Sequence, residues 1–332
     1  MSQETLHSRS IIIDGTCPLL YDLEYTGNCV AGGLTAVVPT VQNAGGVVGS
    51  LNNIGAWHNK IRNDDKLLLV RSAADILKAK ETGKMGIILH FQGADPLEDK
   101  IDLVDAYKAA GIGMIQLTYN VKNRLGDGCE ERTDAGLSKF GVAVIKRMNE
   151  ARIVVDVSHT GYRTTMETFE VSERPVVFSH ACARAVYGSQ RNILDDQIKA
   201  VAATGGLVGV AAVPFFVSDS KRPTMDDFVR HIDHMVSLVG PDHVALGLDY
   251  YTGQHPYSSD EAAMALYKGH LKQGRWGASY PPPPYYYPEG METPDRLGNL
   301  TEGLRARGYS EDDTQKIMGL NWFRVFKEVW GG

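Results

Sequence analysis

The feature of this 332-residue sequence that most constrains its fold is a regular alternation of short apolar runs with amphipathic segments. The apolar runs are rich in Val, Ile and Leu, as strands buried on both faces are. Amphipathic segments such as 99–111, 136–151 and 194–205 lie between them, and each ends at Gly or a short turn. Eight runs follow the pattern: SIIID (10–14), LTAVVPT (34–40), MGIILHFQ (85–92), IGMIQLTYN (112–120), RIVVDVSH (152–159), RPVVFSH (174–180), GLVGVAAVPF (206–215) and HVALGLDY (243–250).

This alternation predicts an α/β fold of parallel βαβ units, and the number of runs favours a closed (β/α)8 TIM barrel. The runs extend over about 240 residues, and such barrels typically have about 250. An open doubly wound sheet is the alternative, but no GxGxxG turn follows the first run. The run DKLLLV (65–70) is expected to be an extra strand or part of a long second connection.

We expect a single barrel domain over residues 1–332, with two segments that depart from the alternation. An insertion around 253–295 contains PPPPYYYP, which cannot be a helix or a central strand, because proline lacks the N–H and has a fixed φ. An ordered loop packed on its tyrosines is favoured over an SH3-type ligand. Residues 299–330 predict two closing helices, the second with Ser310 and Asp313 as an N-cap and capping box.

Composition argues against several classes of function. A net charge of −6 and a pI near 5.9 disfavour nucleic-acid binding, and no basic or long apolar run indicates a membrane. The N-terminal MSQETLHSRS lacks the apolar core of a signal peptide, and the four cysteines form no CxxC pair. We therefore predict a cytoplasmic protein with reduced thiols and a small-molecule substrate. Because symmetric dimers are common, we also expect a homodimer.

The residues that end each run are the candidates for a site, because catalytic residues of a (β/α)8 barrel lie at the carboxyl ends of its strands. His159 and His180 end adjacent runs, and each follows a serine. We expect them to converge as metal ligands, with Asp249 accepting a proton from bound water. The polar run ends are Asp14, Thr16, Cys17, His90, Gln92, Tyr119, Asn120, Asp156, Ser158, His159, Ser179, His180 and Asp249.

An arginine and two cysteines are further candidates for the same site. Arg191 follows His180 by 11 residues and can clamp a substrate carboxylate with two parallel hydrogen bonds. The alternative is a surface arginine near the acidic pair 195–196. Cys17 and Cys129 are candidate nucleophiles, but no histidine is adjacent in sequence, and buried inert thiols are favoured.

Four segments together resemble the renal (membrane) dipeptidases, peptidase family M19 of the amidohydrolase superfamily. They are GLSKFGVAVIKRMNEARIVVDVSHT, PVVFSHACARAVYGSQRNILDDQI, VALGLDYYTG and GYSEDDTQKIMGLNWFRVF. The resemblance covers most of the chain and implies a (β/α)8 barrel that, in typical members, holds two zinc ions bridged by hydroxide and a glutamate. It implies metal binding by His159 and His180, carboxylate binding by Arg191 and proton handling by Asp249. It also implies hydrolysis of dipeptides, including some with a C-terminal D-residue.

The chain departs from the family at the other ligand positions. DGTCPLL stands where the family has DGHNDLP, so Thr16 and Pro18 replace a histidine and an aspartate. Gln92 in FQGADPL replaces the bridging glutamate, and Tyr119 in LTYN replaces a substrate-contacting histidine. Neutral oxygen donors bind Zn²⁺ weakly and proline does not bind it. We therefore expect no binuclear centre, and either one Zn²⁺ or similar ion or none.

These observations predict a dipeptidase-like hydrolase that acts on a dipeptide or a small N-acyl or amide compound with a free carboxylate, using at most one metal ion. Gln92, Asn120, Arg191 and Tyr119 are expected to contact the substrate, and Tyr119 is a candidate catalytic residue with Asp249. Two alternatives stay open: a metal-independent lyase or isomerase acting on a small carboxylate, and a non-catalytic small-molecule binding protein. Thr16, Gln92 and Tyr119 favour the former, because they suit hydrogen bonding better than metal ligation.

Overall fold

The computed structural model describes residues 5–42, 44–277 and 279–331. Its strands form one parallel sheet in the order β1-β10-β9-β8-β7-β6-β5-β2-β4-β3, and β1 also pairs with β2, so the sheet closes on itself. The strands are β1 (Ile13–Cys17), β2 (Ala36–Gln42), β3 (Leu67–Leu69), β4 (Met85–Ile87), β5 (Leu89–Phe91), β6 (Ile112–Gln116), β7 (Val154–Asp156), β8 (Val176–Ala181), β9 (Leu207–Val210) and β10 (Val244–Leu246).

The strand pattern confirms the predicted (β/α)8 barrel. β4 and β5 are one run interrupted at Ile88, and both pair with β2. If β4 and β5 are counted as one strand, the closed barrel has eight strands, one for each predicted run. β3 pairs with β4 outside the ring and is the extra strand expected from DKLLLV.

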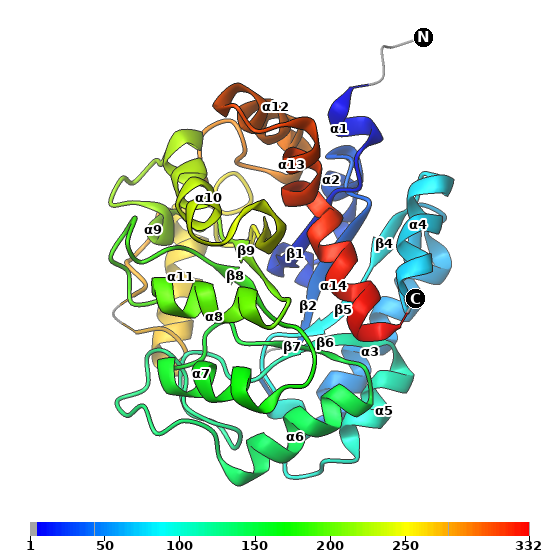
Figure 1. Cartoon of the computed structure of the whole chain (residues 1–332), viewed down its shortest axis with the longest axis vertical. Coiled ribbons are helices and arrows are strands. Elements are labelled where there is room, and N and C mark those ends of the chain that lie inside the picture. Colours follow the sequence, from blue (N-terminus) through cyan, green and yellow to red (C-terminus); the bar gives the residue numbers. More distant parts are fainter. Residues whose placement is uncertain (1–4, 43, 278, 332) are drawn as a thin grey trace.

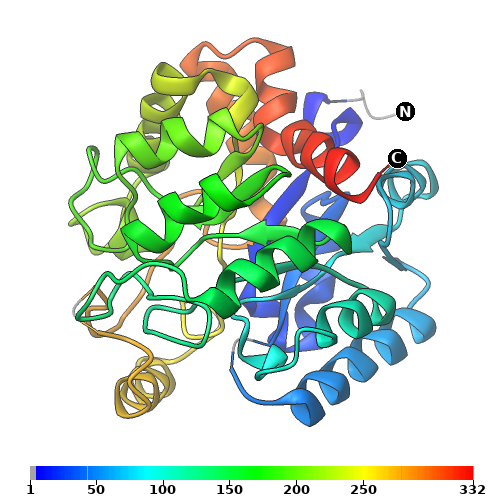
Figure 2. The ribbon, with the colours of Figure 1, turned by 60° about the horizontal axis from the view of Figure 1, so that its bottom comes forward.

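Helices surround the strands in both views of the ribbon (Figures 1 and 2). They are α1 (Leu6–Arg9), α2 (Thr26–Ala31), α3 (Val47–Asn63), α4 (Ala73–Thr82), α5 (Leu103–Ala110), α6 (Lys139–Glu150), α7 (Tyr162–Val171), α8 (Asp195–Ala203), α9 (Pro214–Val217), α10 (Met225–Val239), α11 (Asp260–Lys272), α12 (Gly298–Arg307), α13 (Glu311–Gln315) and α14 (Asn321–Trp330). Several begin at a capping side chain, such as Ser138, whose Oγ accepts a hydrogen bond from the Gly141 N–H at 2.9 Å before α6.

Helix α14 closes the amino-terminal end of the barrel. Its aromatic rings Trp322, Phe326 and Trp330 stack in series, with centroids 5.2 Å and 4.3 Å apart. The Trp322 indole N–H donates to the Leu246 carbonyl at 2.7 Å. Gly15 makes room for this ring, because a Cβ there would lie 2.2 Å from Trp322 Cζ2. These rings share a buried cluster with residues from all eight strands of the barrel. The barrel residues of this cluster include Ile13, Ala36, Ile88, Met114, Val154, Val177, Leu207 and Ala245.

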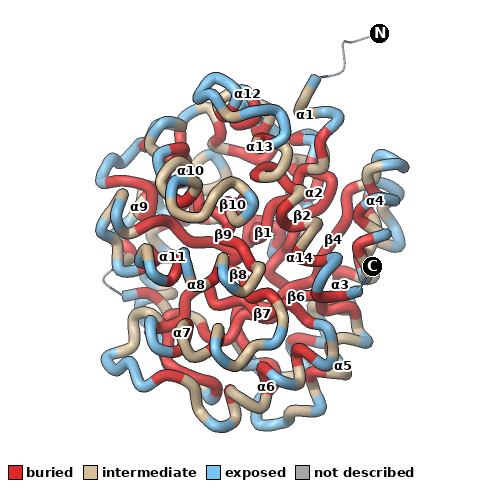
Figure 3. The backbone as a smooth tube through the Cα atoms, viewed as in Figure 1, coloured by how far each residue is buried: buried red, intermediate tan, exposed pale blue. Residues whose placement is uncertain are grey.

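Because α14 fills the amino-terminal end, the open end of the barrel is the one at the carboxyl ends of the strands. The strands lie in the buried centre of the molecule, and exposure is concentrated on the outer helices (Figure 3). This places the polar residues that end the strands in a buried mouth, where each needs a partner or a ligand.

The segment 253–295 contains a helix, α11, that the sequence pattern did not predict. Tyr285 and Tyr287 of PPPPYYYP are buried, while Tyr286 between them is only partly covered. In the closing region, the Ser310 Oγ accepts the Asp313 N–H at 3.0 Å, as the predicted N-cap requires. A π-helical turn, Lys316–Leu320, joins α13 to α14 and interrupts what the sequence predicts as one helix.

None of the described helices combines the length and the apolar character that crossing a membrane would require. The four cysteines are free thiols, and Cys17, Cys29 and Cys182 are buried.

Candidate active site

Two imidazoles face each other at the open end of the barrel. His159 follows β7, His180 lies in β8, and their Nε2 atoms are 2.7 Å apart. Both residues are buried. The structure therefore brings together the two histidines that the sequence pattern singles out.

The tautomer of His159 is fixed by Asn120. The Asn120 Nδ2 donates to the Arg275 carbonyl at 2.8 Å, which can only accept, so the amide oxygen must face the other way. That oxygen lies 2.6 Å from His159 Nδ1, which therefore carries the proton. Because burial and the charge of Arg191 lower the pKa of His159, the ring is neutral and Nε2 presents a lone pair.

His180 is oriented in the same sense by a serine and an aspartate. The Ser179 Oγ donates to Asp156 Oδ2 at 2.5 Å, which leaves its lone pair for the proton on His180 Nδ1, 2.7 Å away. Burial alone would raise the pKa of Asp156, but His90, His180 and Ser179 outweigh it and lower the pKa to about 2. The ionised carboxylate thus holds the His180 Nε2 lone pair towards His159, as outer-shell partners do for metal-ligating histidines.

Gln92 lies against both lone pairs. Its Nε2 is 3.2 Å from His180 Nε2 and 3.5 Å from His159 Nε2, and its Oε1 accepts the Thr40 hydroxyl at 3.2 Å. An amide flip would exchange these roles and turn the oxygen towards the histidines.

The two-zinc centre implied by the family does not fit these residues. Within the described part of the chain, no three His, Cys, Asp or Glu side chains form a group that could hold a metal. Pro18 offers no donor, and the buried Thr16 hydroxyl has no hydrogen-bond partner among the described residues. A single ion is a different case, because two imidazole nitrogens that carry lone pairs lie 2.7 Å apart.

Asp249 lies in the same mouth, just after β10. Its backbone N–H donates to the Thr16 carbonyl at 2.9 Å, while its Oδ1 is buried with no partner in the described structure. Burial raises the pKa of Asp249, Arg191 opposes this, and Asp14 and Asp156 add to it. A buried carboxyl with a free oxygen and a raised pKa is suited to exchanging a proton with a ligand.

Arg191 is buried, with 3% of its surface exposed, which excludes the surface arginine considered as the alternative. Its guanidinium lies 5.0 Å from the centroid of the Phe216 ring. Its Nε and Nη2 are buried without a hydrogen-bond partner among the described residues. Such donors are costly to leave unpaired, so they are suited to an anionic ligand.

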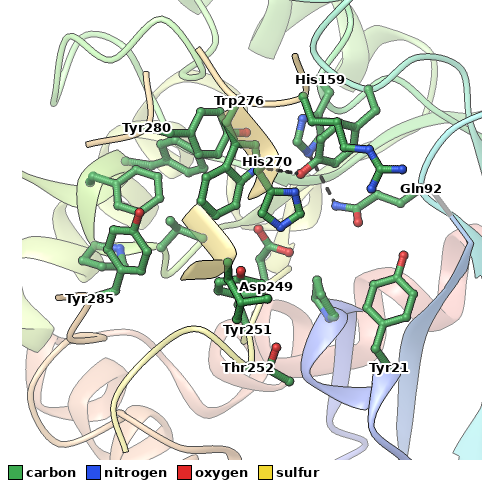
Figure 4. Close-up of a pocket in the computed structure, with 18 of the residues that line it drawn as sticks. Tyr21, Gln92, His159, Asp249, Tyr251, Thr252, His270, Trp276, Tyr280 and Tyr285 are labelled. Atoms are coloured by element: carbon green, nitrogen blue, oxygen red, sulfur yellow. Dashed lines mark hydrogen bonds between the residues drawn. The ribbon is translucent and has the colours of Figure 1, made fainter. Parts of the chain in front are cut away.

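Two cavities meet at His159. The larger encloses about 340 Å³ and is lined by His159, Gln92, Asp249, Tyr119 and Pro18 together with many aromatic side chains. The second encloses about 260 Å³ and is lined by His159, Arg191 and other polar residues. Figure 4 shows Asp249 in the larger cavity between His159 and Gln92 on one side and Tyr251 on the other. Arg191 therefore faces the site from the side of the second cavity.

Tyr119 and Asn120 are placed differently from one another. The Tyr119 ring stacks on His159 at 4.2 Å between centroids, and its hydroxyl accepts the Trp276 indole N–H at 3.2 Å. Burial is the main cause that raises the pKa of Tyr119 to about 12, so it holds its proton. Asn120 does not line the larger cavity, and its amide is occupied by His159, Arg275 and Tyr280. Its position suits orientation of His159 rather than contact with a substrate.

Three of these residues share an uncommon backbone conformation. Asn120, His159 and Asp249 have φ values of 59°, 62° and 58°. The left-handed region disfavours residues other than glycine, although Asn, Asp and His enter it more readily than most.

Sequence reasoning gave no role to two groups near the site. His90, buried in β5, lies 3.3 Å from Asp156 through its Nε2. Its position at the end of a predicted strand could have indicated a role at the site. The aromatic wall of the larger cavity comes mainly from residues 251–287, and the only signal there was the richness of that segment in Tyr and Trp. Cys17 does not line either cavity, whereas Cys129 lines the second, where burial is the main cause that raises its pKa to about 11.

The fold and the histidine pair define an amidohydrolase-type barrel. A crystal structure of an amidohydrolase from Pseudomonas aeruginosa is 37% identical, has a TM-score of 0.91 and covers 98% of each chain. The chain belongs to the membrane dipeptidase family, peptidase family M19, whose sequence model matches residues 2–263.

Two further proteins are similar to this chain. An uncharacterized Klebsiella pneumoniae protein from the pqqA 5′ region is 30% identical over an alignment of 281 positions that covers 80% of this chain and 90% of that protein. The structure of the probable dipeptidase PvdM from Pseudomonas aeruginosa has a TM-score of 0.82, covering 98% of this chain and 96% of the other. At 18% identity it supports the fold alone.

Proposed function

We propose that this chain hydrolyses an amide bond in a small N-acyl or dipeptide compound that carries a free carboxylate, using at most one metal ion. The observation that carries the proposal is the pair of imidazoles, with Nε2 atoms 2.7 Å apart, beside a cavity lined by His159 and by Asp249, whose Oδ1 has no partner among the described residues. Membership of a dipeptidase family supports the same reaction class.

The side chains divide the reaction between binding and proton transfer. The unpaired N–H groups of Arg191 bind the substrate carboxylate. Water adds to the amide carbon, and Asp249 takes one of its protons. The C–N bond then breaks, and the proton returns from Asp249 to the leaving nitrogen, so that an acid and an amine are formed. The raised pKa of Asp249, caused chiefly by burial, favours holding the proton between these steps.

A single divalent ion would be held by His159 Nε2, by His180 Nε2 and, after an amide flip, by Gln92 Oε1. When bound, such an ion polarises the substrate carbonyl and lowers the pKa of water. Asn120 and Ser179 keep both imidazoles in the tautomer that this requires.

Elemental analysis of protein purified without chelator or metal-affinity resin tests the proposal. We expect about one zinc or similar ion per chain, lost in His159→Ala and His180→Ala. His234→Ala is the matched control, because His234 pairs with Asp195 on α8 and lines neither cavity. The same samples are assayed for hydrolysis of dipeptides of both configurations and of N-acyl amino acids. Absence of metal after incubation with zinc or manganese, together with no hydrolysis, would contradict the proposal.

One observation favours a second candidate, a metal-independent lyase or isomerase acting on a small carboxylate. The Gln92 amide already donates towards both imidazole lone pairs, so the pair is satisfied without an ion. Turnover of small carboxylates that is unaffected by chelators would distinguish this candidate. Binding of such carboxylates without turnover would instead indicate a binding protein.

The homodimer and the cytoplasmic location stay predictions from the sequence. Light scattering coupled to size-exclusion chromatography measures the first, and fractionation of the source cells measures the second.

A further inference from the structure

The larger cavity has an aromatic wall opposite the histidines. Figure 4 shows Trp276, Tyr280 and Tyr285 across the cavity from His159 and Gln92. The wall comes from the segment between the last strand and the closing helices, with two rings added from α9. Its members are Tyr251, His270, Trp276, Tyr280, Tyr285, Tyr287, Phe215 and Phe216.

The rings of this wall hold one another in place. His270, Trp276 and Tyr280 stack nearly parallel, with successive centroids 4.3 Å and 4.6 Å apart and interplanar angles of 22° and 10°. Phe215 packs obliquely on Tyr280 at 5.6 Å and on Tyr285 at 5.0 Å. Rings fixed in this way form a surface on which another ring can stack or pack edge to face.

The wall is connected to the histidine pair through Tyr119. The Trp276 indole N–H donates to the Tyr119 hydroxyl, and the Tyr119 ring stacks on His159. A ligand with its reacting bond at His159 therefore extends along this wall.

Two polar atoms on the wall have no hydrogen-bond partner in the described part of the chain. The Tyr251 hydroxyl and His270 Nδ1 are buried, and the described structure offers neither a hydrogen bond. Buried polar groups are normally hydrogen-bonded, so a ligand with a polar substituent would complete them.

The charges of this cavity favour a neutral group over an amine. Asp249 is the one acidic side chain among the described residues that line it, and Arg275 is the one side chain with a fixed positive charge. A substrate ammonium would compete for the carboxyl that handles the proton, whereas an acyl group leaves Asp249 free.

We propose that the aromatic wall is a subsite for a flat aromatic acyl group with a polar substituent, so that the preferred substrates are N-aroyl amino acids. This inference rests on the proposed function, because it takes the carboxylate at Arg191 and the amide at His159 and Asp249 as given. The cavity of about 340 Å³ is within the range of small-molecule sites, roughly 300–1,000 Å³.

Calorimetric binding of N-acetylglycine, N-benzoylglycine and N-(4-hydroxybenzoyl)glycine tests the subsite without requiring turnover. We expect the benzoyl compound to bind about tenfold tighter than the acetyl compound, through ring burial and ring–ring contact. Tyr285→Leu should reduce this ratio. Tyr286→Leu, which alters a neighbouring ring outside the cavity, should not.

Tyr251→Phe provides a variant that keeps the ring and removes a hydroxyl that has no hydrogen-bond partner among the described residues. It should fold normally and should lose the added affinity for the hydroxybenzoyl compound over the benzoyl compound. Equal binding of all three compounds, or a benzoyl preference unchanged in Tyr285→Leu, would overturn the subsite. If the protein prefers the aryl compounds but hydrolyses none of them, the subsite is supported and the proposed function is refuted. If it hydrolyses N-acyl amino acids without preferring aryl groups, the proposed function is supported and the subsite is refuted.

Discussion

His159 and His180 point their Nε2 lone pairs at each other across 2.7 Å. Two lone pairs at this distance repel unless something positive stands beside them. In this structure the Gln92 amide N–H groups do so, at 3.2 Å and 3.5 Å. A cation at the pair would have to compete with this amide, so the residue at position 92 bears directly on metal affinity.

Gln92→Glu should increase the affinity for zinc by about tenfold or more, because a carboxylate is a stronger ligand than an amide and adds a negative charge. Competition with a chromogenic chelator measures the change. Gln42→Glu is the matched control, because Gln42 lines the same cavity without a hydrogen bond to the histidines. An equal gain in both variants would show a general charge effect and would contradict ligation by residue 92.

Asn120→Gly should reduce zinc affinity by about 10- to 100-fold, because His159 would lose the acceptor that fixes its tautomer. Glycine accepts the φ of 59° at this position, so the loss would not come from backbone strain. Asn120→Asp restores an acceptor and should recover much of the affinity. If zinc binds Asn120→Gly as tightly as the unaltered protein, Asn120 does not position His159.

Arg191→Met should weaken binding of N-acetylglycine by about 10- to 100-fold, the range expected for lost hydrogen bonds to a charged group. The carboxamide N-acetylglycinamide has no carboxylate and serves as the control ligand. Its affinity should be nearly the same for both proteins. A parallel loss for acid and amide, measured by calorimetry, would show that Arg191 supports the site without binding the carboxylate.

Asp14→Asn should reduce the loss in the free energy of unfolding that accompanies a rise from about pH 4 to pH 7. Burial raises the pKa of Asp14 from 3.8 to about 7, against the hydrogen bonds from the Leu248 and Thr16 N–H groups. The folded state thus binds this proton more tightly than the unfolded chain. Its stabilising effect is complete below the unfolded pKa and is lost as the pH rises through about 7.

Thermal unfolding of both proteins from pH 4 to pH 8 measures this effect. Asparagine keeps the single oxygen, Oδ1, that accepts both backbone hydrogen bonds, so the fold should be retained. Parallel curves for the two proteins would show that Asp14 is not the group responsible.

The barrel was predictable because each of its eight strands is a short apolar run rich in Val, Ile and Leu. Strands of this composition are expected to be buried on both faces. The convergence of His159 and His180 was predictable for a related reason. They end neighbouring parallel strands, and neighbouring strand ends meet at one edge of a barrel.

The directions of the side chains were not predictable in the same way. Asn120 follows a strand and resembles a ligand-binding residue in sequence, yet its left-handed backbone turns the amide to His159 and to the Arg275 carbonyl. Arg191 reaches the site through a second cavity, and α11 lies within an insertion that strand–helix alternation does not describe. These placements depend on contacts between segments far apart in the chain.

The left-handed backbone at Asn120, His159 and Asp249 has a consequence for where the fold carries its strain. Each such residue costs the fold on the order of 1 kcal/mol compared with an unstrained one. Strain of this kind persists only where surrounding contacts hold it, and it gathers at active sites and ligand-binding sites. Three such residues at one end of the barrel therefore place a share of the cost of folding next to the cavity, where a preset geometry matters most.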